Sequence, residues 1–446
     1  MANSSADNGN GAAPSGATSS AIGMPGRVVS IDALRGLVMF TMIFVNDLAG
    51  ADKSITPDWM VHFSDRHKGN VSGMTFVDIV FPAFLFIVGM SIPIALSGRL
   101  AKGEPVWKLL LHVVVRTVSL LAIGILMVNG EGHPSGKEMG ISANTWTVLM
   151  FTSVLLAFCS LSPPNRATAG ETTKRVCRGL TVLLRAVGLA GLAWAAWVFR
   201  NGKGTRIISL EPFSIHTSWY GILGLIGWAY LMAALVFLIF RTNRTAILGC
   251  VGLMICLFAA DKKGLFEGTW LSHILGVGDM LGSHPSIATA GVLLGTIFLT
   301  PQTSTTASRS RFTLLFFAGF AAAAILLTKQ WGISKNGATP AWCLWSSAIT
   351  AALWLGFYFI ADVWQLKFIS KPLAIAGENV LLAYILSEMM ESVFNLIHWH
   401  DWQLSDGYGR LAGPYLADAI GRSVGCAIFI LCITALLNRV GFRLKL

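Results

Sequence analysis

Residues 27–50 read RVVSIDALRGLVMFTMIFVNDLAG and residues 72–93 read SGMTFVDIVFPAFLFIVGMSIP, and these two apolar runs decide the fold. Each run is long enough to cross a bilayer as a helix, which takes about 20 residues. Asp32, Arg35, Asn46 and Asp78 lie at or inside the ends of the two runs. Ionisable groups at membrane depth are costly, so we interpret this region as part of a functional site in a membrane protein.

The composition extends this interpretation to the whole chain. Of its 446 residues, 54% are hydrophobic and only 12% are charged, whereas a soluble domain is about 25% charged. The short alternating segments of a barrel are absent, so we predict an all-α, polytopic transmembrane helical bundle with about 11 to 12 spans. The predicted spans are 34–50, 76–97, 108–128, 144–162, 180–199, 218–240, 245–260, 286–300, 312–328, 342–361, 374–397 and 417–437.

The basic residues of the loops predict an orientation. If the N-terminus is cytoplasmic, the loops and tail on the inside hold 16 Lys and Arg residues against 12 outside. This bias favours both termini in the cytoplasm. The loop with His62 and His67 then faces the non-cytoplasmic side. The net charge of +11 comes with no basic groove interleaved with aromatic residues, so nucleic acid is not an expected partner.

The chain divides into two parts by composition. Residues 1–26 are rich in Ser, Gly, Ala and Asn and predict a disordered segment, while 27–446 form one transmembrane domain. The seven cysteines make no CxxC pair and lie mostly in apolar runs, which is typical of buried small hydrophobes. No zinc-ligand spacing occurs, so no metal is expected. His398 and His400 are interpreted as part of a Trp-rich interface loop.

The first apolar run carries a polar stripe. At about 100° per residue, Asp32, Arg35 and Asn46 fall within roughly 60° of one another on a helix. Two simpler alternatives stay open. Asp32 and Arg35 could form an interfacial ion pair, and Asn46 could bond to another helix.

The loop between the two runs, WMVHFSDRHKGNVSG at 59–73, contains His62 and His67. Histidine is the side chain best suited to acid–base chemistry near neutral pH. Asp78 would orient one of them as a carboxylate partner, or it would simply stabilise the first turn of its helix through the helix dipole. A histidine in a wet loop is also commonly only a surface residue.

Further polar residues occur late in the chain. Lys335 and Asn336 precede a span, where the lysine could also extend to the membrane surface. Asn379 and Glu388 lie nine residues apart in AGENVLLAYILSE. On an unbroken helix they would point to nearly opposite faces, so both can line one pocket only if the helix is kinked.

Taken in order, these motifs resemble the heparan-α-glucosaminide N-acetyltransferase family of transmembrane acyltransferases. The resemblance rests on SIDALRG (30–36), FVN (44–46), the histidine loop, G-x-T-x-x-DIVFPAFLFIVGMSI (73–92), ISKNGATPAWCL (333–344), Asp362 and AGENVLLAYILSE (376–388). It is dense over 27–97 and 331–390. The family's Gly-x-Leu-Gln-Arg element is not evident, and NTWTVLMF at 144–151 stands in its place.

The resemblance, to a group with many bacterial members, implies an acyltransferase domain over 27–446 in an integral protein of a bacterial inner membrane. Such a protein moves an acetyl group from cytoplasmic acetyl-CoA to a sugar amine or hydroxyl across the membrane. The catalytic histidine lies in the first non-cytoplasmic loop, and Asn46 matches the asparagine beside it. By spacing to Gly73 the family histidine is best matched by His67, whereas His62 follows a Trp-x-x pattern and needs an insertion.

These arguments define a predicted site. The catalytic candidates are His67, His62, Asn46 and Asp78. The substrate-binding candidates are Asp32, Arg35, Lys335, Asn336, Asn379 and Glu388. Acetyl-CoA is the expected co-substrate and the partners are membrane lipid and an amino sugar or glycan acceptor, with a homodimer left open. The alternative function is a secondary transporter of a small polar or sugar-like solute, which intramembrane charges would also suit.

Overall fold

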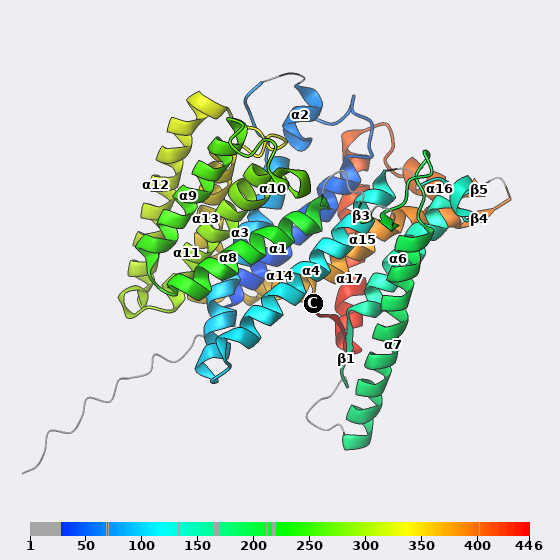
Figure 1. The fold of residues 1–446 in the computed structure, drawn as a ribbon, viewed down its shortest axis with the longest axis horizontal. Helices are drawn as coiled ribbons and strands as arrows, with labels where there is room; N and C mark the ends of the chain where they lie inside the picture. The colour runs from blue at the N-terminus through cyan, green and yellow to red at the C-terminus, as the bar shows by residue number, and fades with distance from the viewer. Residues whose placement is uncertain are drawn as a thin grey trace, which may run out of the picture.

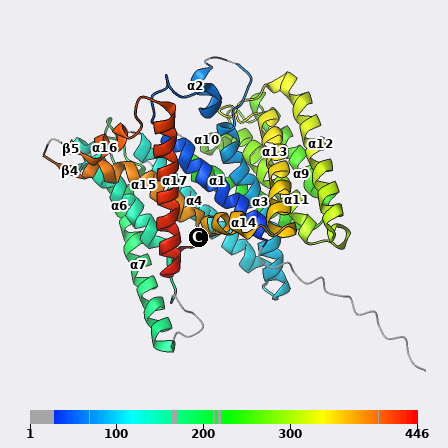
Figure 2. The same ribbon diagram turned by 180° about the vertical axis from the view of Figure 1, so that it is seen from behind.

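The computed structural model describes residues 28–67, 69, 71–132, 134–163, 170–210, 213–215, 220–400 and 402–446. The predicted disordered segment 1–26 lies outside the described residues, as does Asp401. Figures 1 and 2 show a bundle of helices. The strands of the described residues form three short two-stranded ribbons. The all-α prediction is therefore confirmed.

The α-helices are α1 Val29–Leu48, α2 Phe63–Arg66, α3 Val77–Ala101, α4 Val106–Glu131, α5 Gly136–Met139, α6 Ala143–Ala157, α7 Glu171–Val198, α8 Gly221–Phe240, α9 Arg244–Lys262, α10 Trp270–Ile274, α11 His284–Gly295, α12 Thr306–Trp331, α13 Pro340–Tyr358, α14 Lys367–Ala376, α15 Val380–Leu396, α16 Leu404–Arg410 and α17 Leu416–Arg439. Short 3-10 turns are η1 Asp58–Met60, η3 Thr296–Phe298 and η4 Pro301–Thr303, and π-helical turns are η2 Gly278–Ser283 and η5 Phe359–Val363. The strands are β1 Cys159–Leu161, β2 Ile208–Leu210, β3 Phe213–Ile215, β4 His398–Trp399, β5 Trp402–Gln403 and β6 Phe442–Leu444.

Ten helices of the described residues are long and apolar enough to cross a membrane, or eleven if α14 and α15 form one span bent by 67°. The fourth predicted span corresponds to α6, whose 15 residues are short for a crossing. The run predicted at 286–300 is longer than expected, because the π-helical turn η2 extends that span to Gly278–Phe298. The sequence pattern missed this turn, which breaks the 3.6-residue periodicity.

Helix α1 lies at the centre of the bundle and packs against α3, α13, α14, α15 and α17 (Figures 1 and 2). Its contact with α14 is close, because a Cβ at Gly36 would collide with the carbonyl group of Leu373. The helix is interrupted after α14, where the path bends by 67°, and α15 then packs against α1. This arrangement places the start of α15 beside the N-terminal half of α1.

A second close contact joins α3 to α11. A Cβ at Gly89 would collide with the carbonyl oxygen of Ala288, and one at Gly291 would collide with that of Phe86. In the span that contains α11, 94% of the most apolar 18-residue window is buried inside the protein. Helix α7, in contrast, extends away from the bundle in Figure 1, and only 11% of its corresponding window is buried, so its apolar side chains face the lipid region.

Candidate functional site

The loop between α1 and α3 brings a histidine onto a buried carboxylate. His62 immediately precedes the short helix α2, and its Nδ1 lies 2.7 Å from Oδ1 of Asp78 in the first turn of α3. The Asp78 side chain is 2% exposed and that of His62 is 29% exposed. The carboxylate is therefore held inside the protein, while the imidazole reaches the surface of the loop.

Asp78 is surrounded by hydrogen-bond donors. Its Oδ2 accepts the backbone N–H groups of Phe63 at 3.1 Å and Thr75 at 3.0 Å, and the Thr75 hydroxyl lies 3.3 Å away. An ionised carboxylate can only accept hydrogen bonds. We therefore assign the proton of the neutral imidazole to Nδ1 of His62, which leaves a lone pair on Nε2. That is the arrangement a general base requires.

Lys335 reaches the same histidine from the loop between α12 and α13. Its Nζ lies 3.2 Å from Nδ1 and 3.1 Å from Nε2 of His62. Burial lowers the pKa of the Lys335 ammonium, while the nearby carboxylates of Asp78 and Asp65 act in the opposite direction. The site thus contains a carboxylate, an imidazole and an amine from three separate segments.

Backbone contacts explain why these segments meet. The N–H of Gly73 donates to the carbonyl of Ile333 at 2.9 Å, and the N–H of Ile333 donates to the Ser72 hydroxyl at 2.7 Å. The indole N–H of Trp342 donates to the backbone carbonyl of Asp78 at 3.1 Å. These bonds fasten the Lys335 loop and α13 to the start of α3. Asn336 is exposed in the same turn.

His67 lies elsewhere in the loop. It is stacked on Phe63, with ring centroids 4.1 Å apart, and its Nδ1 lies 3.2 Å from the Phe63 carbonyl oxygen. Within the described residues, Asp78 is therefore paired with His62 and not with His67. The spacing argument favoured His67, but the two-turn path of the loop through η1 and α2 turns His62 toward α3.

Asn46 lies near the C-terminal end of α1 and contacts a different helix. Its Nδ2 is 3.4 Å from Oε1 of Glu388 on α15. Among the described residues, no hydrogen bond joins Asn46 to His62. Val45, the residue before Asn46, lines a small pocket together with His62. Asn46 is therefore adjacent in sequence to a residue that shares a pocket with the histidine.

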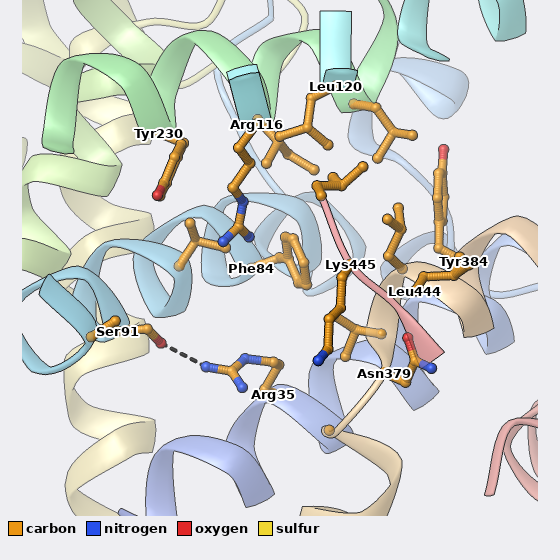
Figure 3. Close-up of a pocket in the computed structure, with 18 of the residues that line it drawn as sticks. Arg35, Phe84, Ser91, Arg116, Leu120, Tyr230, Asn379, Tyr384, Leu444 and Lys445 are labelled. Atoms are coloured by element: carbon orange, nitrogen blue, oxygen red, sulfur yellow. Dashed lines mark hydrogen bonds between the residues drawn. The ribbon is translucent and has the colours of Figure 1, made fainter. Parts of the chain in front are cut away.

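A larger cavity lies toward the other end of α1. Its volume is about 490 Å³, and α1, α3, α4, α8, the start of α15 and the last residues of the chain line it. Figure 3 shows Arg35, Arg116 and Lys445 turned toward the same space. Arg35 also pairs with Asp32 at 2.8 Å and donates to the Ser91 hydroxyl at 2.6 Å. The ion pair of Asp32 and Arg35, left open above as an alternative, is thus present, and its arginine forms part of the cavity wall.

Asn379 also lines this cavity. It lies at the break between α14 and α15, and its Nδ2 donates to Oδ1 of Asn438 at 3.0 Å. Glu388 lies farther along α15, beside Asn46. The helix is therefore kinked before α15. Asn379 lines the cavity, whereas Glu388 contacts Asn46.

Several cavity residues were not predicted from the sequence. Arg116 and His112 are four residues apart on α4, and Arg99 lies at the end of α3. Arg116 is an ionisable residue inside the apolar run VVVRTVSLL, which is the same signal that pointed to Arg35. No sequence pattern marks Lys445, because it reaches the cavity only through the pairing of strand β6 with strand β1. No group of three or more His, Cys, Asp or Glu able to hold a metal ion occurs among the described residues.

The apolar spans around buried polar clusters define the class: this is an integral membrane protein with a polytopic helical fold. A family model described as a domain of unknown function, DUF5009, matches residues 27–275, more than half of the chain. The chain belongs to this family.

Two characterised relatives match over a shorter segment. The heparan-alpha-glucosaminide N-acetyltransferase of Homo sapiens is 33% identical over 106 residues, and that of Mus musculus is 34% identical over 103 residues. These segments cover 24% and 23% of this chain and 14% of each relative. The resemblance drawn from the sequence motifs is confirmed over this part of the chain.

Proposed function

We propose that the protein is a membrane-embedded acyltransferase that moves an acetyl group from cytoplasmic acetyl-CoA to an amine or hydroxyl of a sugar on the non-cytoplasmic side. The observation that carries the proposal is the 2.7 Å contact between His62 and the buried carboxylate of Asp78. The names of the two relatives support N-acetyl transfer as the reaction class. The orientation, with both termini cytoplasmic in a bacterial inner membrane, is part of the proposal.

The proposed chemistry uses His62 as the base. Nε2 takes the proton of the acceptor amine or hydroxyl as its nitrogen or oxygen attacks the thioester carbonyl. The new C–N or C–O bond forms, the C–S bond breaks, and the imidazolium returns its proton to the departing thiolate of coenzyme A. Asp78 holds the ring in the required tautomer and stabilises its charge during the step.

A second route remains part of the proposal. Nε2 of His62 would attack the thioester carbonyl itself, so that the C–S bond breaks and the thiolate of coenzyme A leaves. The acceptor would then attack the acyl-imidazole, the bond from the acyl carbon to Nε2 would break, and Nε2 would take the acceptor's proton. In either route Asn46 is proposed to donate an amide hydrogen to the developing oxyanion. Its contact with Glu388 at 3.4 Å is long, and the amide carries a second N–H.

The experiment uses purified full-length protein with acetyl-CoA labelled in the acetyl group and a panel of amino sugars. We expect label in the sugar product with wild type and its loss in His62→Ala. His67→Ala is the matched control, because that histidine is exposed in the same loop and does not contact Asp78. Retention of full transfer by His62→Ala would refute the assigned role, and trapping of labelled protein distinguishes the two routes.

One observation favours a second candidate function. The break between α14 and α15, bent by 67°, places Gly377, Glu378 and Asn379 in the cavity wall. Broken helices at a polar cavity are typical of secondary transporters. Uptake of a labelled amino sugar into proteoliposomes without any acyl donor would support transport, whereas strict dependence on acetyl-CoA would exclude it.

A further inference from the structure

The last strand of the chain forms part of the cavity wall. Strand β6, Phe442–Leu444, pairs antiparallel with β1, with Leu444 opposite Cys159, and the Lys445 N–H donates to the Phe158 carbonyl at 2.9 Å. The pairing brings the segment across from α17 to the end of α6, and residues 444–446 then line the cavity.

The strand is held at both of its ends. Before it, Gly441 has φ +85°, which favours glycine, and its carbonyl accepts the Ser162 N–H at 3.0 Å. On the partner strand, the Arg185 guanidinium of α7 donates to the Cys159 carbonyl at 2.7 Å. The position of Lys445 is therefore set by backbone bonds and not by its own side chain.

Lys445 adds a fourth cation to three arginines. Arg35 pairs with Asp32 and Arg99 pairs with Glu104, each at 2.8 Å. The Arg116 guanidinium lies 4.5 Å from the centre of the Tyr230 ring. Among the described lining residues, the acidic side chain is that of Glu378, and it pairs with Arg443 at 3.8 Å. Cationic side chains therefore outnumber acidic ones in the lining of a cavity large enough for a ligand.

We propose that this cavity binds phosphate groups and that Lys445, delivered by β6, is a specificity-determining residue for them. The ligand class is an organic phosphate with several negative charges. Guanidinium and ammonium groups from separate elements converge on it, an arrangement suited to phosphate oxygens. The inference rests on the proposed function in taking coenzyme A as the phosphate source, and an anionic lipid headgroup is the other source of the same chemistry.

The test measures the Kd of coenzyme A for full-length protein in nanodiscs of neutral lipid. Lys445→Gln should raise the Kd by about tenfold, because a hydrogen bond to a charged group is lost. Lys445→Arg should stay within about twofold, since it keeps the charge. Arg439→Gln is the matched control: it removes one exposed positive charge six residues away, outside the cavity lining.

A second arm measures thermal stabilisation of the same proteins by phosphatidylglycerol. An unchanged Kd in Lys445→Gln overturns the inference and leaves the proposed function standing. If wild type does not bind coenzyme A, but phosphatidylglycerol raises its Tm and not that of Lys445→Gln, the phosphate site is supported and the proposed function fails. If neither ligand distinguishes Lys445→Gln from wild type, the inference is refuted. Equal Tm values without ligand verify that the variants fold.

Discussion

Nδ1 of His62 and Oδ1 of Asp78 are 2.7 Å apart, and the carboxylate of this pair is almost completely buried. The backbone N–H groups of Phe63 and Thr75 hold the same carboxylate from the other side. A histidine oriented in this way has a fixed tautomer and direction, with its Nε2 facing the Lys335 amine at 3.1 Å, whereas an isolated loop histidine has neither.

The first prediction concerns this pair. Asp78→Asn and His62→Ala should each lower acetyl transfer by at least about a hundredfold, the usual contribution of a positioned base. The rate with labelled acetyl-CoA and an amino sugar measures this. His67→Ala should stay within about twofold of wild type. An equal loss in His67→Ala would assign the base to the other histidine.

The second prediction follows from the burial of Lys335, which lowers the pKa of its ammonium below the ordinary value of 10.5. Between the folded and unfolded pKa values the unfolded chain binds more protons, so the free energy of unfolding rises with pH across that window. Relative to Lys335→Met, the Tm of wild type should therefore rise as the pH approaches the ordinary lysine value of about 10 from below.

Thermal unfolding at several pH values measures this difference. Lys329→Met is the control, because Lys329 is exposed at the end of α12. Its Tm difference from wild type should not change with pH. The burial argument fails if Lys335→Met follows wild type at every pH.

Several residues of the candidate site could be predicted from the sequence alone. Asp78 and Asn46 stood out because each is a polar residue at the end of an apolar run, and helix periodicity is a local property. The partner of Asp78 could not be predicted with the same certainty. The path of a loop with two short helical turns decides whether His62 or His67 faces α3, and sequence spacing does not determine that path.

For the residues that line the larger cavity, less could be predicted from the sequence. Arg35 and Arg116 each carry the local signal of a charge in an apolar helix. Lys445 does not, because it reaches the cavity only through the pairing of β6 with β1, across more than 280 residues of chain. Such long-range pairing depends on the assembled bundle and leaves no periodic pattern at residues 442–446.

The third prediction tests the contact between α3 and α11. Gly89→Ala should lower the free energy of unfolding by about 1–3 kcal/mol, because the new methyl group would collide with the Ala288 carbonyl. Gly98→Ala is the matched control on the same helix, where a Cβ meets no atom within 4 Å. It should be neutral or stabilising, since alanine favours helix by up to about 1 kcal/mol. Equal Tm values for the two variants would contradict the close packing.

The fourth prediction compares a buried ion pair with an exposed one. Arg422 Nε lies 3.0 Å from Asp47 Oδ2, with side chains 4% and 9% exposed. Arg422→Met leaves this carboxylate buried without its cation and should cost about 3–5 kcal/mol of unfolding free energy. The control Arg443→Met breaks the half-exposed pair with Glu378 and should cost less than about 1 kcal/mol. Denaturant or thermal unfolding in the same detergent measures both, and similar costs would refute the role of burial.

The fifth prediction separates two roles of Asn46, which contacts Glu388 at 3.4 Å. If Asn46 stabilises the oxyanion, Asn46→Ala should lower kcat by about a hundredfold or more with little change in KM. Glu388→Gln, which keeps a side chain able to accept the same bond, should then retain most of the activity. If Asn46 only ties α1 to α15, Asn46→Ala and Glu388→Ala should lower the Tm by similar amounts, and the residual activity of the two folded variants should be alike. Steady-state kinetics and thermal unfolding on the same preparations distinguish these outcomes, because a donor that acts only in the transition state changes kcat without changing stability.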